Sequence, residues 1–316
     1  MTGGAGFIGS HLVEALVARG DAVTILDDGR NANADENLAS VKSDVTLFEG
    51  DCTCASDAIE ASNPDTIFHL AAPAYVPPSV EDPLSDLRGN VEQTLRLLNA
   101  LRARDRAPRL VHVSSAAVYG HPNVQPIRET YPPAPVSPYG VDKFCAEEHV
   151  RVASLIHGIR AVVLRYFPVY GPRQRKQVVY DLIRKIEADP TTLEIHGTGR
   201  ELRDLCFVDD IVAGTITVGE GAPGRGEAIN LGSGQMHTIE HLARTICTVL
   251  GVEPELRFTG NVRPGDAERI VADITKARTF GFDPTISLRA GVERTVEWAR
   301  SESSNPRSAN RKRGVA

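Results

Sequence analysis

The segment TGGAGFIG, residues 2–9, is followed by SHLVEALVARG, residues 10–20, in which apolar residues recur three or four positions apart. That spacing predicts a helix over Ser10–Arg19. Gly3, Gly6 and Gly9 then lie in a turn that leads into a helix N-terminus. Backbone N–H groups and the positive end of the helix dipole favour a pyrophosphate there, and the absence of side chains permits its close approach. The segment therefore predicts a dinucleotide site.

Asp27 strengthens this interpretation. It closes the apolar stretch AVTILD, 18 residues after Gly9, near the ~20-residue spacing expected for an acid that binds the adenine ribose. Asp27 and Asp28 both repel a 2′-phosphate, which favours NAD over NADP, whereas Arg30 is the residue that would favour the phosphate. We therefore expect NAD as the cofactor. The alternative is a tight turn flanked by surface carboxylates.

Alternating segments define the fold class. Between residues 20 and 167, β-branched and apolar stretches alternate with helix-like ones, as in parallel strands joined by helices. We predict an α/β protein with a doubly wound parallel sheet (Rossmann) as an NAD-binding domain in residues 1–167. A smaller C-terminal substrate-binding α/β region follows in residues 168–300, with some segments returning to the first domain. Residues 301–316 are polar and basic, and we expect a disordered tail.

The individual elements follow from the same patterns. The predicted strands are Ala22–Asp27, Val45–Gly50, Thr66–Ala71, Leu110–Ser115 and Ala161–Phe167. The predicted helices are Ser10–Arg19, Pro83–Arg104, Tyr139–His157, Val178–Ala188, Ile239–Leu250 and Leu288–Ala299.

The N-terminus does not fit this pattern completely. A strand should precede Thr2-Gly3-Gly4, but only Met1 does. We hypothesise that the first, central strand is truncated and that Met1 stands where a strand valine belongs, through a misassigned GTG start or through trimming. The intact mass of the native protein tests this hypothesis.

Composition excludes several function classes. Hydrophobic residues make up 41% and charged residues 24%, and no apolar run approaches the ~18 residues of a membrane span. No signal peptide is recognisable, so a cytoplasmic location is expected. The net charge of -6 gives no broad attraction for nucleic acid. The five cysteines lack metal-ligand spacing and are expected to be reduced thiols, so no metal site is predicted.

Tyr139 and Lys143 lie four residues apart in SPYGVDKFCAEEH, on one face of a predicted helix. A neighbouring ammonium lowers the pKa of a phenol from ~10 toward the working range of a general base. Ser114 and Ser115 end a predicted strand in VSSAAVYG, at the carboxyl edge where such sheets bind ligands. The Tyr–Lys spacing alone is typical of a surface pair, but the combination with the serines indicates a catalytic site.

A series of motifs runs from residue 2 to residue 277: TGGAGFIG, GDCT, HLAAPA, VSSAAVYG, PYGVDK, LRYFPVYGPRQ, GTGRELRDLCFVDDIV, NLGSG and RPGDAERIVADITKA. In their order and spacing the chain resembles the extended short-chain dehydrogenases/reductases, within the NAD-dependent nucleotide-sugar epimerase/dehydratase family. The resemblance covers nearly the whole chain, and it implies an enzyme that uses NAD and acts on a nucleotide sugar.

The resemblance also implies roles for single residues. Ser115 would hydrogen-bond the reacting hydroxyl, Tyr139 would be the base, and Lys143 would bind the nicotinamide ribose. Asp51 would contact adenine. Arg203 and Arg263 would hold the diphosphate bidentately, with Asp266 on the nucleotide ribose. The implied cofactor-binding residues are Gly3, Gly6, Phe7, Ile8, Gly9, Asp27, Asp51, Cys52, Leu70, Ala71, Ala72, Tyr139 and Lys143, and the implied substrate-binding residues are Ser115, Tyr139, Arg203, Arg263 and Asp266.

Within that family the branches differ in the steps after oxidation of the sugar at C4. Dehydratases add a second acid–base pair, and decarboxylases typically place a glutamate just before VYG; here Ala116 and Ala117 occupy these places. The resemblance therefore favours a 4-epimerase, an isomerase of UDP-hexoses or UDP-hexuronates acting through a transient 4-keto sugar. A decarboxylase or dehydratase is the alternative, and a non-catalytic NAD-binding regulator is a third.

Two prolines depart from the family pattern. Pro168 in RYFPVYG replaces an Asn or Thr that touches substrate, and Pro73 in HLAAPA replaces a polar residue, so the sugar cannot be assigned from the motifs. Arg173 and Arg175 are either ligands of a sugar carboxylate or surface charges.

The long predicted helices carry more apolar residues than one sheet face needs. By the resemblance these helices imply a homodimer, although the same apolar residues fit an intramolecular core. The apolar residues are Leu87, Val91, Leu95, Leu98, Cys145, Val152, Leu155 and Ile156.

Overall fold

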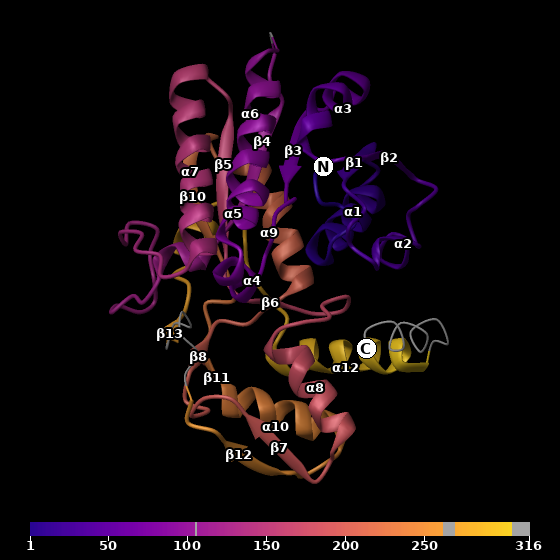
Figure 1. The fold of residues 1–316 in the computed structure, drawn as a ribbon, viewed down its shortest axis with the longest axis vertical. Helices are drawn as coiled ribbons and strands as arrows, with labels where there is room; N and C mark the ends of the chain where they lie inside the picture. Colours follow the sequence, from indigo (N-terminus) through magenta and orange to yellow (C-terminus); the bar gives the residue numbers. More distant parts are fainter. Residues whose placement is uncertain (105, 262–268, 305–316) are drawn as a thin grey trace.

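The computed structural model describes residues 1–104, 106–261 and 269–304. A larger lobe contains the main sheet, and a smaller lobe lies below it in Figure 1. Within the larger lobe, β10 (Arg225–Leu231), β5 (Ala161–Tyr166), β4 (Arg109–Ser115) and β3 (Thr66–His69) are parallel neighbours in that order. β1 (Val23–Asp27) pairs in parallel with β2 (Val45–Glu49). The predicted Rossmann-type α/β fold is confirmed.

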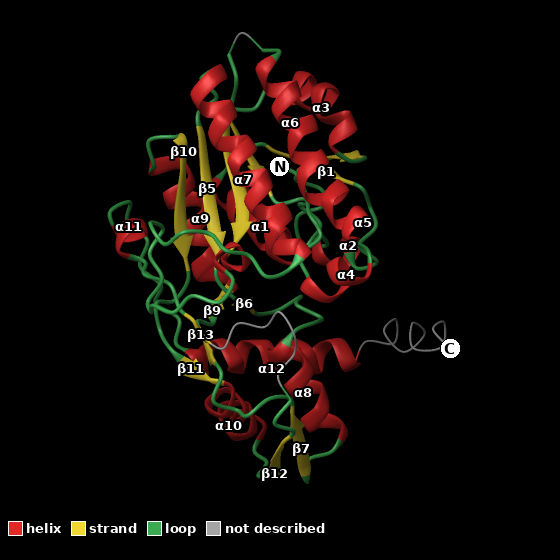
Figure 2. Ribbon diagram, turned by 60° about the vertical axis from the view of Figure 1, so that its left-hand side comes forward, coloured by secondary structure: helices red, strands yellow, loops and turns green. Residues whose placement is uncertain are grey.

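Helices cover both faces of this sheet (Figure 2). α7 (Pro138–His157) packs on β4, β5 and β10, and is joined on that side by α6 (Gln93–Arg102) and α3 (Ala55–Ser62). α1 (Phe7–Arg19) and α9 (Val208–Gly221) contact each other and cover the opposite face. The remaining short elements of the larger lobe are α2 (Ala34–Asn37), η1 (Cys52–Cys54), α4 (Val76–Glu81), α5 (Pro83–Leu87), η2 (Arg88–Glu92), η3 (Ala116–Tyr119) and α11 (Thr275–Arg278).

The smaller lobe is built from α8 (Val178–Ala188), α10 (Ile239–Leu250) and α12 (Leu288–Ser304), which pack on one another. Its strands are short because each pair spans only the turn-rich segments between helices. They are β6 (Val169–Tyr170) with β9 (Cys206–Phe207), β7 (Thr192–Ile195) with β12 (Glu255–Phe258), and β11 (His237–Thr238), β8 (Leu202–Arg203) and β13 (Arg269–Ile270) in one sheet.

Most predicted boundaries agree with the structure to within three residues, and two elements differ more. The predicted helix Pro83–Arg104 is three consecutive pieces, α5, the π-turn η2 and α6, ending at Arg102. The last helix runs to Ser304 instead of Ala299, so the predicted disordered tail was wrong for its first four residues, 301–304. Glu302 is anchored there by Arg175, whose Nη2 lies 2.5 Å from its carboxylate. Residues 305–316 lie outside the described part of the chain.

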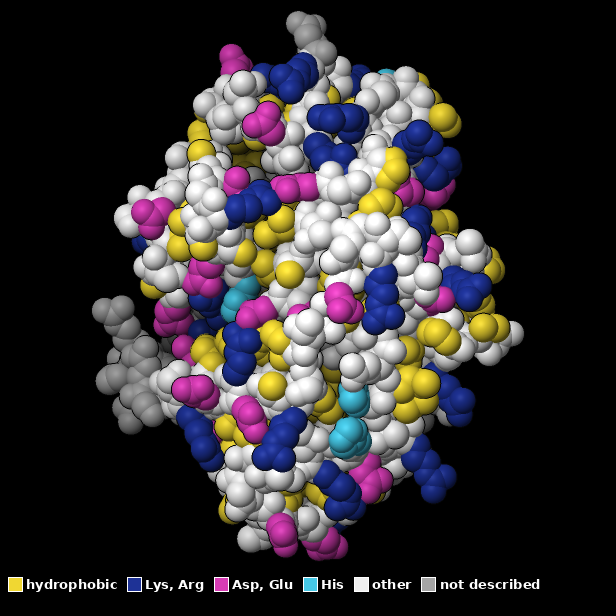
Figure 3. Space-filling model, turned by 180° about the vertical axis from the view of Figure 1, so that it is seen from behind, with side chains coloured by type: hydrophobic (Ala, Val, Ile, Leu, Met, Phe, Trp, Pro, Cys, Tyr) yellow, Lys and Arg dark blue, Asp and Glu magenta, His cyan; other side chains and the backbone are white. Residues whose placement is uncertain are grey.

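The mixed surface charge and the free cysteines agree with what the composition predicts. On the face seen in Figure 3, basic and acidic side chains are interspersed over both lobes. Cys52, Cys54, Cys145, Cys206 and Cys247 are all free thiols. Within the described ranges, none of the helices combines the length and apolarity that crossing a bilayer requires.

Met1 and Thr2 lie between β1 and β3 and join the two parts of the sheet. Thr2 forms parallel bridges to Leu26 and to His69, and the Thr2 N–H donates to Phe68 O at 3.0 Å. Beyond Met1, a groove of about 390 Å³ continues between the same two strands. The Met1 ammonium ends in it, where burial lowers the pKa of that amine to about 6. The groove therefore lies where a short extended segment would pair with both strands.

A chain extended by four β-branched residues before Met1 is expected to be more thermally stable. The extension pairs with β1 and β3, and each Val or Ile buried in the groove contributes about 1.5–3 kcal/mol. Scanning calorimetry should show a higher Tm, by roughly 2–4 °C for each kcal/mol gained. An extension of four Gly and Ser residues is the control, and equal Tm values for the two extensions would contradict a strand-accepting groove.

Candidate active site

The glycine turn is packed so closely that two of its positions exclude a side chain. A Cβ on Gly9 would lie 2.1 Å from Gly3 O. Gly3 has a φ of +71°, and a Cβ placed on it would lie only 2.7 Å from Ala71 N. The turn therefore brings the start of α1 directly against the end of β3. Positive φ and close backbone approach both require glycine here.

The start of α1 fits a pyrophosphate. The N-cap residue Gly6 offers no side chain to the first-turn N–H groups, and the first turn contains no acidic residue. The positive end of the helix dipole is thus left for an external anion. Phe7, Ile8 and Gly9 form that first turn. These backbone donors suit the diphosphate of a dinucleotide.

Asp27 ends β1 beside the glycine turn, as the spacing predicts. Its Oδ2 accepts from Ala5 N at 3.0 Å and its Oδ1 from Gly29 N at 3.1 Å. Asp28 pairs with Arg30 at 3.3 Å, and the Arg30 side chain is 85% exposed. Asp27 is the residue aimed at the turn, which favours a free ribose hydroxyl over a 2′-phosphate at this position.

The residues expected around adenine follow β2 and β3. Asp51 caps η1 by accepting from Thr53 N at 2.8 Å, and Gln93 Nε2 donates to its other oxygen at 3.2 Å. Buried Cys52 donates its N–H to Gln93 Oε1 at 2.8 Å. Gln93 on α6 was not foreseen from the sequence. Leu70, Ala71 and Ala72 leave the end of β3 alongside the glycine turn.

Ser115, Tyr139 and Lys143 converge where β4 ends and α7 begins. Ser115 is the last residue of β4, and its hydroxyl lies close enough to Tyr139 to lower the pKa of the phenol. Lys143 Nζ lies 5.8 Å from the centre of the Tyr139 ring and donates to Val113 O at 3.3 Å. Ser137 caps α7 by accepting from Gly140 N at 3.1 Å, which fixes the turn that carries Tyr139.

Burial dominates the acid–base properties of this group. Desolvation raises the pKa of Tyr139 to about 12, although the Ser115 hydroxyl lowers it. Desolvation lowers the pKa of Lys143 to about 8. A buried phenol and a buried amine both favour their neutral forms. The ammonium must therefore be stabilised by charge if it is to help ionise the phenol.

Two buried histidines lie in register beneath Lys143. His69 on β3 bonds Thr2 and Thr94, at 2.7 Å and 3.2 Å. His112 stacks on it at 5.4 Å, and neither of its ring nitrogens has a hydrogen-bond partner among the described residues. Burial lowers the pKa of His69 to about 3 and that of His112 well below its usual value. Both rings are neutral near pH 7.

A second buried hydrogen-bond network, which was not predicted from the sequence, holds Ser114, the neighbour of Ser115. Arg165 on β5 binds Glu147 with Nη2 at 2.7 Å and Nε at 3.0 Å, and donates to Tyr119 at 2.8 Å. Glu147 also accepts from Ser114. The Ser114 side chain thus turns toward this network and leaves Ser115 to face Tyr139.

The expected diphosphate residues are only partly described. Arg203 is half-buried in β8, and its Nη1 donates to Leu202 O at 3.0 Å. Arg263 and Asp266 lie outside the described residues. The adjacent Asp204, also missed from the sequence, is fully buried and accepts from Ser233 N at 2.6 Å, Gly234 N at 2.9 Å and Ala272 N at 3.0 Å. It ties the NLGSG turn and the ADITKA segment to the strand that carries Arg203.

Arg173 and Arg175 are not solvated surface charges. Arg173 donates to Ser10 Oγ at 3.1 Å and to Glu14 at 2.5 Å on α1. Arg175 binds Glu36 and Glu302 and stacks on Trp298. The surface-charge alternative was wrong, because acidic residues distant in sequence lie opposite each guanidinium. These arginines hold the two lobes together.

The two unusual prolines have structural contacts. Pro168 O accepts from Cys206 N at 2.9 Å, which continues the pairing of β6 with β9. Pro73 packs against Gly89 in the π-turn η2, where a Cβ would lie 2.5 Å from the Pro73 ring. The π-turn therefore approaches the loop after β3 closely.

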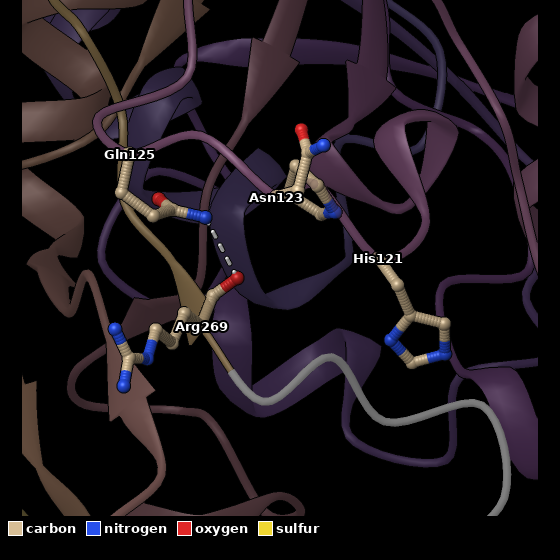
Figure 4. A pocket seen from close by; sticks show the side chains of 5 residues that line it. His121, Asn123, Gln125 and Arg269 are labelled. Carbon is tan, nitrogen blue, oxygen red and sulfur yellow. Dashed lines mark hydrogen bonds between the residues drawn. The ribbon is translucent and has the colours of Figure 1, made fainter.

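A cavity of about 510 Å³ lies beside the loop after VYG (Figure 4). Gln125 Nε2 bonds Arg269 O across it at 2.9 Å, while His121 and Asn123 line the loop side. Ser115, Tyr139 and Lys143 are not among its lining residues. We place the active site by the converging side chains and not by this cavity.

The fold and this site define a dinucleotide-binding enzyme of the Rossmann class. Residues 1–232 match the model of the NAD dependent epimerase/dehydratase family, and the chain belongs to that family. The resemblance inferred from the motifs is confirmed, as is NAD as the cofactor of the group.

Several known proteins are similar over nearly the whole chain. The UDP-glucose 4-epimerase of Mycolicibacterium smegmatis is 36% identical, covering 96% of this chain and 98% of its own length. The UDP-glucuronic acid 4-epimerase of Bacillus cereus, solved with UDP-glucuronic acid and NAD, is 31% identical with a TM-score of 0.88, covering 95% and 98%. The UDP-glucuronic acid decarboxylase 1 of Xenopus tropicalis is 31% identical, covering 96% of this chain and 72% of its own length.

Gly9→Ala is expected to abolish NAD binding. The new methyl group meets the Gly3 carbonyl, so the turn must open and withdraw its N–H groups from the pyrophosphate. Isothermal titration with NAD measures the loss. Gly221→Ala is the matched control, because a Cβ there would lie 3.9 Å from Phe280, at ordinary van der Waals distance. Retained affinity in Gly9→Ala would refute the placement of the cofactor.

Proposed function

We propose that this chain is an NAD-dependent nucleotide-sugar 4-epimerase acting on UDP-hexoses or UDP-hexuronates. The observation that carries the proposal is the convergence of Ser115 with buried Tyr139 and Lys143 at the carboxyl edge of the sheet, beside the glycine turn. Relatives named as 4-epimerases of UDP-glucose and UDP-glucuronic acid support it.

In this reaction Tyr139 removes the proton from the sugar 4-hydroxyl, and Ser115 hydrogen-bonds the same oxygen. Lys143, as the ammonium, lowers the cost of the phenolate and binds ribose hydroxyls of the cofactor. NAD, which the glycine turn and Lys143 would hold, would supply the acceptor and donor of the hydride exchanged at C4 of the sugar. Tyr139 then gives the proton back to the inverted hydroxyl.

The residues before VYG favour epimerisation over the competing outcomes. Ala116 is buried, and both Ala116 and Ala117 lie in η3 directly after Ser115. Neither side chain transfers a proton, so a keto sugar held there meets no second acid–base group from this turn. The similarity to a decarboxylase keeps loss of CO2 as the second candidate outcome.

Substrate recognition is proposed to fall on the smaller lobe. Arg203 binds the diphosphate with Arg263, and Asp266 binds the nucleotide ribose. Asp51, Cys52 and the Leu70–Ala72 segment surround the adenosine half of NAD. The cytoplasmic location stays a prediction from the sequence.

Tyr139→Phe is expected to reduce turnover ~10²–10⁴-fold while leaving NAD affinity unchanged, because only the transferable proton is lost. The parent and the variant are incubated with UDP-, dTDP-, GDP- and CDP-sugars and followed by mass spectrometry and NMR. Unchanged mass with inverted C4 in the parent supports the proposal. Loss of CO2 or water would redirect it to the second candidate, and full activity of Tyr139→Phe would refute the catalytic assignment.

We also propose a homodimer formed through α4, α5 and α7, which pack side by side. Exposed apolar side chains gather on these helices, as at interfaces between subunits. Val91 and Leu98, which the sequence also suggested for this face, are buried in the core instead. The exposed residues are Val80, Leu84, Leu87, Val141, Val152, Leu155 and Ile156.

Light scattering at micromolar concentration is expected to give twice the mass of the 34.1 kDa chain. Leu155→Glu, at a side chain 77% exposed, should shift the population toward monomer because a charge is buried at the interface. Val124→Glu, on an exposed apolar residue away from these helices, is the control. A monomeric parent would contradict the proposal.

A further inference from the structure

A pair of buried carboxyl groups lies behind the catalytic residues. Asp86 on α5 is 4% exposed and Asp142 on α7 is 6% exposed, and the two helices pack on each other, so that each carboxyl group affects the pKa of the other. Asn90 in the π-turn donates to Asp86 Oδ2 at 3.0 Å. Two neighbouring buried carboxylates repel each other when both are ionised, which favours a proton on one of them.

Asp86 is also the carboxyl group that faces both catalytic side chains. Its charge raises the pKa of Lys143 and that of Tyr139. Asp142 is the residue immediately before Lys143, and its own interaction is with Asp86. The pair thus connects α5 to the turn of α7 that carries the catalytic residues.

Among the residues that the structure describes, the other groups around Lys143 do not supply a free negative charge. From β4 and β3 it faces Val113 O and the neutral rings of His112 and His69. From α7 it faces Tyr139 and Glu147, but Glu147 is engaged by Arg165 through three contacts of 2.7–3.1 Å. Asp86 is therefore the main counter-charge for the buried ammonium.

We propose that Asp86 and Asp142 share a proton and act as positioning residues for the epimerase, holding Lys143 charged and setting the pH range in which Tyr139 works. The inference rests on the proposed function. Neither aspartate touches the substrate or the cofactor in this role; both act through Lys143 and Tyr139.

The direction of the effect follows from charge. A negative charge next to a phenol and an ammonium raises the pKa of both groups, so removing it lowers both. Burial and the neighbouring Asp86 raise the pKa of Asp142 to about 6. The shared proton is therefore retained below about pH 6 and lost as the pH rises through that value.

The first test is the pH profile of kcat/KM, with whichever UDP-sugar the parent epimerises. In Asp86→Asn both limbs should move to lower pH, by about one unit or more, because both titrating groups lose the same neighbouring charge. Asp142→Asn keeps the charge of Asp86 and should leave the basic limb in place. Glu148→Gln, an exposed α7 residue paired with Arg151 at 2.7 Å, is the control.

The second test is an infrared titration of the parent, which needs no turnover. The carbonyl stretch of a protonated carboxyl should be present at pH 5, disappear toward pH 8, and be absent at pH 5 from Asp142→Asn. That band is read even if Asp86→Asn fails to fold. A parent without the band, or an Asp86→Asn profile that overlays the parent after scaling, would overturn the inference. A parent that turns over no sugar but shows the titrating band would overturn the proposed function and not the pair.

Discussion

The site depends on backbone contact between the glycine turn and the ends of β1 and β3. Thr2 bridges Leu26 and His69, and Gly3 lies against Ala71 so closely that no side chain fits between them. This contact aligns the carboxyl ends of the parallel strands at one edge. The helix N-terminus, Asp27 and Ser115 meet there because parallel strands present their carboxyl ends on the same side.

Behind that edge, the protonation of Tyr139 and Lys143 depends on charge in a buried environment. Desolvation works against both the phenolate and the ammonium, so nearby charge decides their protonation. Two buried carboxyl groups have different partners in this region. Glu147 neutralises the structural Arg165, and Asp86 faces Lys143. Because Arg165 already engages Glu147, that carboxylate is not free to pair with Lys143.

The connection between the lobes also arises from pairs that are distant in sequence. Arg173 and Arg175 reach Glu14 on α1, Glu36 on α2 and Glu302 on α12. Asp204 collects N–H groups from two separate turns. A lone arginine or aspartate carries no local signal of such a partner, which explains why sequence patterns predicted neither the ion pairs of the arginines nor a role for Asp204.

Local sequence patterns predicted the Rossmann fold, because apolar periodicity and glycine spacing follow from backbone geometry. The order of the motifs predicted the family and NAD as its cofactor. The local patterns also placed β1 to β5 and the main helices to within a few residues. The open groove beside Met1, the Glu147–Arg165 network and the Asp86–Asp142 pair emerged only from the packed chain. These features join residues tens of positions apart or more, and burial, which sets their energies, exists only once the chain has packed.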